Sequence, residues 1–85
     1  MEKVLLKDEQ KISKEEIAEK LVKISQGVKR GDLTLNSGEE QVAMEFSDTP
    51  EFEIKVEEEG SEMSLELEIE WDKNKKGKSG GVEIS

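Results

Sequence analysis

Carboxylates at alternating positions are the residues of this 85-residue chain that could do chemistry. If residues 51–56 and 63–71 are strands, alternation places five of these carboxylates on one face: Glu51, Glu53, Glu66, Glu68 and Glu70. Such a face could bind a basic protein or peptide, hold a cation, or supply the acid and base of glycoside hydrolysis. A flat, hydrated row offers no cleft that keeps one carboxyl group protonated, and its oxygens do not converge as a Ca²⁺ cage requires. The pattern favours docking or plain solvation over catalysis.

Other catalytic and ligand-binding residues are scarce. The chain has no Cys and no His, which removes the thiol nucleophile, the usual zinc ligand and the usual neutral-pH base. Ser13 has no base in any recognisable pattern, and the glycines form no phosphate loop. We therefore predict no catalytic residue, no cofactor and no metal site, and we expect that the protein is not an enzyme.

The charge of the chain excludes some partners. The net charge is −9, yet residues 73–85 hold four lysines and one glutamate, so the preceding part is more acidic than the total. An acidic body repels phosphate, and we expect no nucleic-acid binding by the folded domain. Residues 73–85 are rich in Lys, Gly and Ser and are predicted to be a flexible tail. The apolar run at residues 4–6 is too short to span a membrane, so a cytoplasmic location is expected.

One helix is predicted to begin after Ser13. Ser13 and Glu16 have the spacing of a capping box, in which the Ser13 side chain accepts the Glu16 N–H and the Glu16 side chain reaches back. Apolar residues then recur with helical spacing on one face, at Ile17, Leu21, Ile24 and Val28. Gly31 is the expected end of the helix, and Gly27 is an alternative end one turn earlier.

Five strands are predicted around this helix. The segments are 4–10, 32–36, 41–46, 51–56 and 63–71, and apolar and polar residues alternate in the last four. We predict an α+β fold of order β-α-β-β-β-β within a single domain, residues 1–72, in which one amphipathic helix packs on one face of a mainly antiparallel sheet of about five strands. The helix stripe and the apolar strand faces would form the core.

A tight turn at Glu59-Gly60 would bring the last two strands into one register. In that register Glu53 lies opposite Glu66 and Glu51 lies opposite Glu68 on the outer face. Directly opposed like charges are destabilising. A shift of two residues would keep the faces and change the pairs, whereas a shift of one would invert a strand.

The chain resembles the amphi-Trp domain family. The shared features are a leading strand, a Ser-x-x-Glu-capped helix, Gly31 before a strand, and a closing strand that reads Leu-Glu-Leu-Glu-Ile-Glu-Trp at residues 65–71. The resemblance covers residues 4–72, and residues 73–85 lie outside it. It implies the fold and adds no catalytic residue, because the family has no established activity.

Trp71 and the acidic face each have two interpretations. Trp71, the only Trp, is expected to plug the open end of a small core, and recognition of a partner is the alternative. The acidic face is either a solvated outer face or a docking surface for a basic protein or peptide. The leading hypothesis is a non-enzymatic accessory or protein-interaction domain, monomeric or weakly homodimeric. The alternatives are a self-associating domain that pairs through Leu5 or a strand edge and, third, a carboxylate-dependent enzyme.

Overall fold

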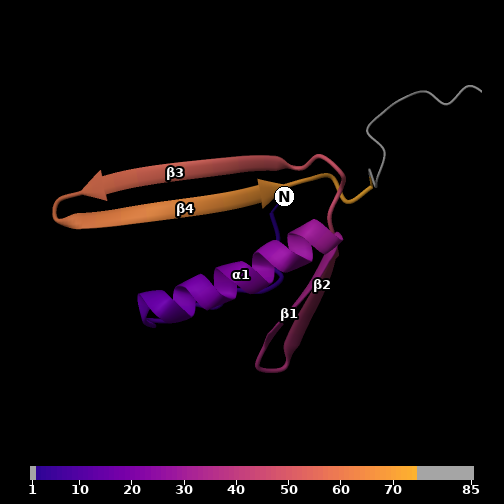
Figure 1. Ribbon diagram of the computed structural model, residues 1–85, viewed down its shortest axis with the longest axis horizontal. Helices are drawn as coiled ribbons and strands as arrows, with labels where there is room; N and C mark the ends of the chain where they lie inside the picture. The colour runs from indigo at the N-terminus through magenta and orange to yellow at the C-terminus, as the bar shows by residue number, and fades with distance from the viewer. Residues whose placement is uncertain (1, 75–85) are drawn as a thin grey trace, which may run out of the picture. The chain divides into compact units, whose positions relative to one another are not determined.

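The computed structural model describes residues 2–74, in which one helix and four strands occur (Figure 1). In chain order these elements are α1 (Lys14–Arg30), β1 (Asp32–Ser37), β2 (Glu40–Glu45), β3 (Glu51–Glu59) and β4 (Glu62–Glu70). The strands form two antiparallel sheets of two strands each, β1–β2 and β3–β4. The chain divides into two compact units, Met1–Glu45 and Phe46–Ser85. The predicted α+β class is confirmed.

Helix α1 begins where the sequence predicts. Ser13 is the N-cap residue in extended conformation, and its side chain accepts a hydrogen bond from the Glu16 N–H at 3.1 Å. The Ser13 hydroxyl also donates to the Glu16 carboxylate at 3.2 Å. This hydroxyl contact joins the two side chains of the predicted capping box, and Glu15 and Glu16 place negative charge at the positive end of the helix.

Helix α1 ends at Gly31 and passes through Gly27 without a break. Gly31 is left-handed, with φ 105°, and its N–H donates to the Gly27 carbonyl at 2.8 Å. Gly27 is buried because β1 approaches it closely: a Cβ built there would lie 2.7 Å from Leu33 Cδ1 and 3.0 Å from the Asp32 carbonyl oxygen. An ion pair of 2.6 Å between Arg30 and Asp32 spans the junction of helix and strand. Glycine at position 27 thus lets β1 pack against the helix (Figure 1).

The β1–β2 hairpin turns at Gly38-Glu39. Ser37 pairs with Glu40, and Gly38 has a φ of 60° while none of the described non-glycine residues has a positive φ. That combination is the signature of a type II′ turn. The alternate residues Leu33, Leu35, Val42 and Met44 are half-buried, as the alternation predicts for the side that faces the helix.

The β3–β4 hairpin has the same kind of turn, at Gly60-Ser61. Glu59 pairs with Glu62, and Gly60 has a φ of 60°. The predicted turn at Glu59-Gly60 was therefore one residue too early, which shifts the register by two. The faces stay as predicted, and the cross-strand pairs change. The two strands run side by side over nine residues each (Figure 1).

The structure differs from the predicted single sheet of about five strands in three ways. Residues 4–10 contain no strand, and their apolar residues fall on both parities, so this segment has no single face to bury. The four strands pair only as two hairpins, so each described strand has one edge without a partner strand. Among the described residues no apolar side chain is buried, whereas the pattern predicts one buried face on each strand.

Candidate functional site

The β3–β4 hairpin separates its side chains into two chemically different faces. The acidic face comprises eight glutamates, one lysine and one serine: Glu51, Glu53, Lys55, Glu57, Glu59, Glu62, Ser64, Glu66, Glu68 and Glu70. The apolar face comprises seven apolar residues and one glutamate: Phe52, Ile54, Val56, Glu58, Met63, Leu65, Leu67 and Ile69. All five glutamates predicted as a docking surface lie on the acidic face. Glu57, Glu59 and Glu62 extend it toward the turn, which continued alternation could have indicated.

Cross-strand pairing on the acidic face sets carboxylate against carboxylate. Glu51 lies opposite Glu70, and Glu53 lies opposite Glu68. These are not the predicted partners, because the register is shifted by two, but the predicted kind of contact remains. Side chains directly opposed in an antiparallel pair have Cβ atoms about 4.5–5.5 Å apart, so like charges there repel.

Lys55 is the cation of the acidic face. It lies opposite Glu66, with Nζ 3.9 Å from the Glu66 carboxylate and 3.7 Å from that of Glu57. These are the ion pairs found on this face within residues 2–74. The Lys55 side chain is 51% exposed, so solvent screens both contacts. Lys55 forms no ion pair with the opposed glutamates nearer the open end of the hairpin, within the described residues.

An open hollow of about 260 Å³ lies at the closed end of the hairpin. It is lined by Glu57, Glu58, Glu59, Glu62, Met63 and Ser64. The glutamates are exposed, and Glu58 belongs to the opposite face from its two neighbours in sequence. In the described part of the chain no group of three or more His, Cys, Asp or Glu side chains is arranged to hold a metal ion.

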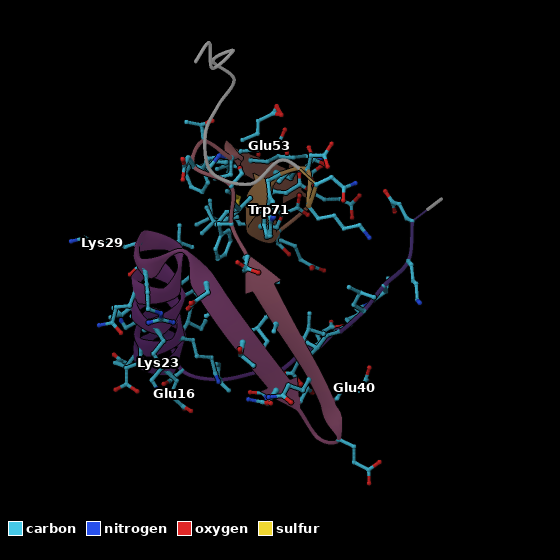
Figure 2. The ribbon with its side chains drawn as sticks, turned by 90° about the vertical axis from the view of Figure 1, so that its right-hand side faces the viewer. Glu16, Lys23, Lys29, Glu40, Glu53 and Trp71 are labelled. Atoms are coloured by element: carbon cyan, nitrogen blue, oxygen red, sulfur yellow. The ribbon has the colours of Figure 1, made fainter. Side chains whose placement is uncertain are left out.

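Trp71 lies at the open end of the same hairpin, as Figure 2 shows. Its ring contacts Phe46, with the ring centroids 4.5 Å apart and the planes tilted by 43°. Both residues are half-buried. Such tilted aromatic contacts contribute about 0.5–1.5 kcal/mol beyond area burial. The contact joins the segment before β3 to the residue after β4.

Within the Phe46–Ser85 unit the apolar face is mostly exposed. Six of its seven apolar side chains are 47–65% exposed, and only Ile69 is half-buried. Large contiguous apolar patches on soluble proteins mark interaction surfaces. The sequence pattern identified the residues of this face correctly.

A second hollow lies within the Met1–Glu45 unit, between α1 and β1. It has a volume of about 410 Å³, and Leu6, Lys20, Ile24 and Leu33 are among its lining residues. The N-terminal segment therefore passes close to the helix and to β1. Asp8, Lys20 and Lys23 also line it, and none of the three forms an ion pair within residues 2–74.

The comparisons with known proteins give one match. The model of the Amphi-Trp domain family matches residues 1–85, which extends the resemblance beyond residues 4–72 to both ends of the chain. No curated protein and no solved structure matches the chain. In residues 2–74 no helix has the length and apolar character needed to cross a membrane.

Proposed function

The chain belongs to the Amphi-Trp domain family, and from that premise we propose that it is a non-enzymatic interaction domain whose acidic face binds a basic protein or peptide. The family has no established activity, so the proposal rests on the hairpin itself. The binding residues would be the five glutamates nearest the open end and centre of the face: Glu51, Glu53, Glu66, Glu68 and Glu70.

The opposed glutamate pairs are the observation that carries this proposal. Glu51–Glu70 and Glu53–Glu68 each cost the free hairpin up to about 1 kcal/mol, because like charges lie opposite one another and neither pair has an ion pair with a lysine or arginine of residues 2–74. A lysine or arginine of a partner placed between the strands would turn each repulsion into two attractions. Solubility alone requires charge on this face and does not require it in opposed pairs.

The same geometry argues against catalysis and against phosphate-bearing partners. The five glutamates proposed to bind the partner are exposed, and none of them lines the open hollow at the turn, so no cleft excludes water from their carboxylates. Nucleic acid would be repelled by this charge. We propose no cofactor and no metal, and we place the protein in the cytoplasm on the basis of its sequence.

Backbone amide shifts would test the proposal. The ¹⁵N-labelled full chain is titrated with a lysine-rich peptide and, separately, with a glutamate-rich peptide of the same length. The lysine-rich peptide should shift the amides of residues 51–53 and 66–70, and the shifts should shrink at high salt, because exposed charges are screened. The glutamate-rich peptide should shift none of them.

A pair of variants with equal charge change separates the site from the net charge. Glu53→Gln/Glu68→Gln removes one opposed pair, whereas Glu39→Gln/Glu40→Gln removes two charges at the β1–β2 turn. The first variant should weaken binding of the lysine-rich peptide several-fold, and the second should leave it nearly unchanged. Equal weakening by both variants, or shifts confined to other surfaces, would contradict the proposal.

A further inference from the structure

We infer that the acidic face selects an extended partner segment with basic residues at two alternate positions, and that Lys55 limits the number of bound cations to two. The inference rests on the proposed function, since it concerns the same face and the same kind of partner. It adds the spacing and the number of the cations that the partner presents. Every contact that carries it lies within the β3–β4 hairpin.

The acidic face is a ladder of cross-strand pairs that carry unequal charge. From the open end of the hairpin to the turn, the pairs are Glu51–Glu70, Glu53–Glu68, Lys55–Glu66, Glu57–Ser64 and Glu59–Glu62. With −1 for each glutamate and +1 for the lysine, their formal charges are −2, −2, 0, −1 and −2. The first two pairs therefore gather four carboxylates at the open end, and the charge of the ladder falls to zero at the third pair.

Lys55 compensates the negative charge in the middle of this ladder. Its Nζ lies 3.9 Å from the Glu66 carboxylate on the other strand and 3.7 Å from the Glu57 carboxylate on its own strand, toward the turn. None of the four glutamates at the open end forms an ion pair within residues 2–74. A partner cation is therefore attracted over the first two pairs. Over the third pair it meets the Lys55 ammonium group and a glutamate that is already paired.

The spacing of the two strongly negative pairs matches that of an extended peptide. Residues two apart on a strand share a face and lie about 6.8 Å apart along it, because each residue advances the strand by about 3.4 Å. An extended partner segment has the same repeat, so a basic-x-basic sequence places one cation over each of the two pairs. Two adjacent basic residues of such a segment point to opposite sides, and only one of them faces the ladder.

Three peptides of equal length, built from Thr and Lys, test the spacing on the full chain. One carries two alternate lysines, one carries two adjacent lysines, and one carries four alternate lysines, and amide shifts of the ¹⁵N-labelled chain give each dissociation constant. The peptide with two alternate lysines should bind about two- to five-fold more tightly than the peptide with two adjacent lysines, because it makes one more exposed charge contact. Its shifts should centre on residues 51–53 and 68–70. Equal affinities of these two peptides would overturn the inferred spacing.

Substitution of Lys55 tests the limit of two cations. In the unaltered chain, four alternate lysines should bind less than about two-fold more tightly than two, because the third pair attracts no further cation. In Lys55→Gln this gain should rise to about three- to ten-fold, because the third and fourth pairs then carry one uncompensated glutamate each. Lys29→Gln removes the same charge from an exposed position of α1 and should leave the gain as in the unaltered chain. The same gain in Lys55→Gln as in the unaltered chain would overturn the inference.

The inference and the proposed function fail in different ways. If none of the lysine peptides shifts the amides of residues 51–53 and 66–70, the proposed function is wrong and the inference falls with it. If the peptides shift these amides but neither the spacing of the lysines nor Lys55→Gln changes the affinities as expected, the inference alone is wrong. The comparison of alternate and adjacent lysines uses the unaltered chain, so it decides the spacing even if Lys55→Gln is unfolded.

Discussion

Lysine substitutions at Glu53 and Glu66 should change stability in opposite directions. Both make the same chemical change on the same face of the hairpin. Glu53 lies opposite Glu68, so Glu53→Lys replaces a repulsion by an ion pair. Glu66 lies opposite Lys55, so Glu66→Lys removes a 3.9 Å ion pair and sets two lysines against each other.

The size of the effect follows from exposure. Cross-strand charge pairs contribute about 0.2–1 kcal/mol, and the Lys55–Glu66 side chains are 51% and 60% exposed, which favours the lower part of that range. We expect Glu53→Lys to stabilise the protein by about 0.5 kcal/mol and Glu66→Lys to destabilise it by a similar amount. The difference of about 1 kcal/mol corresponds to roughly 4–8 °C in Tm for a domain of this size. Both variants reduce the net negative charge equally, so that general effect cancels in the difference.

Thermal unfolding followed by far-ultraviolet circular dichroism provides the measurement. The difference in Tm should be largest at low ionic strength and should shrink in about 1 M salt, where the Debye length is about 3 Å. Equal stabilisation by both variants would refute the register, because it is the result expected if Glu53 lay opposite Glu66. A difference that persists in high salt would refute the electrostatic explanation.

Three further substitutions test other parts of the structure. Gly27→Ala should lower the free energy of unfolding by about 1 kcal/mol. The new methyl group would clash with Leu33 and the Asp32 carbonyl oxygen at a cost of about 1–3 kcal/mol, which exceeds the helix-propensity gain of about 1 kcal/mol. If urea unfolding showed that the variant is more stable, the close packing of β1 on Gly27 would be contradicted. Ser13→Ala should cost about 1 kcal/mol and lower the helical signal at 222 nm, whereas Ser13→Asp should retain both. Trp71→Ala should lower the free energy of unfolding by about 2 kcal/mol because the contact with the Phe46 ring is lost, and Trp71→Phe should retain much of that stability. If urea unfolding gave equal losses for the two variants, the ring contact would contribute nothing to stability.

Local signals predicted the secondary structure well. The Ser13 cap and Gly31 stop define α1 because each acts through hydrogen bonds or dihedral angles of neighbouring residues. Period-two alternation located all four observed strands and assigned their faces. The predicted β3–β4 register was wrong by two residues. The sequence allows Gly60 to be either the first or the second residue of a two-residue loop, and in the structure it is the first, with a positive φ, so the loop is Gly60-Ser61.

Non-local arrangement was predicted less well, for a physical reason. Alternation shows that Phe52 and Leu67 need an apolar partner, but it does not indicate what that partner is, because burial is non-directional. The same limit applies to the expected first strand at residues 4–10, whose pattern gives no preferred face. The five glutamates of the acidic face were predicted correctly, because alternate residues of a strand always share a face. Which glutamates lie opposite each other also depends on the position of the turn, so those pairs were predicted wrongly.

The outer edges of β3 and β4 have no partner strand, and the dense negative charge beside them opposes aggregation through these edges. An open strand edge next to an exposed apolar face is a template for fibril growth, and repulsion between stacked glutamates opposes each added chain. This repulsion weakens as the pH falls toward the isoelectric point of the sequence, about 4.6, where the net charge is zero. Acidification toward this pH, or a large excess of polycations, therefore removes the electrostatic repulsion between chains, so this protein should be stored and crystallised well above that pH.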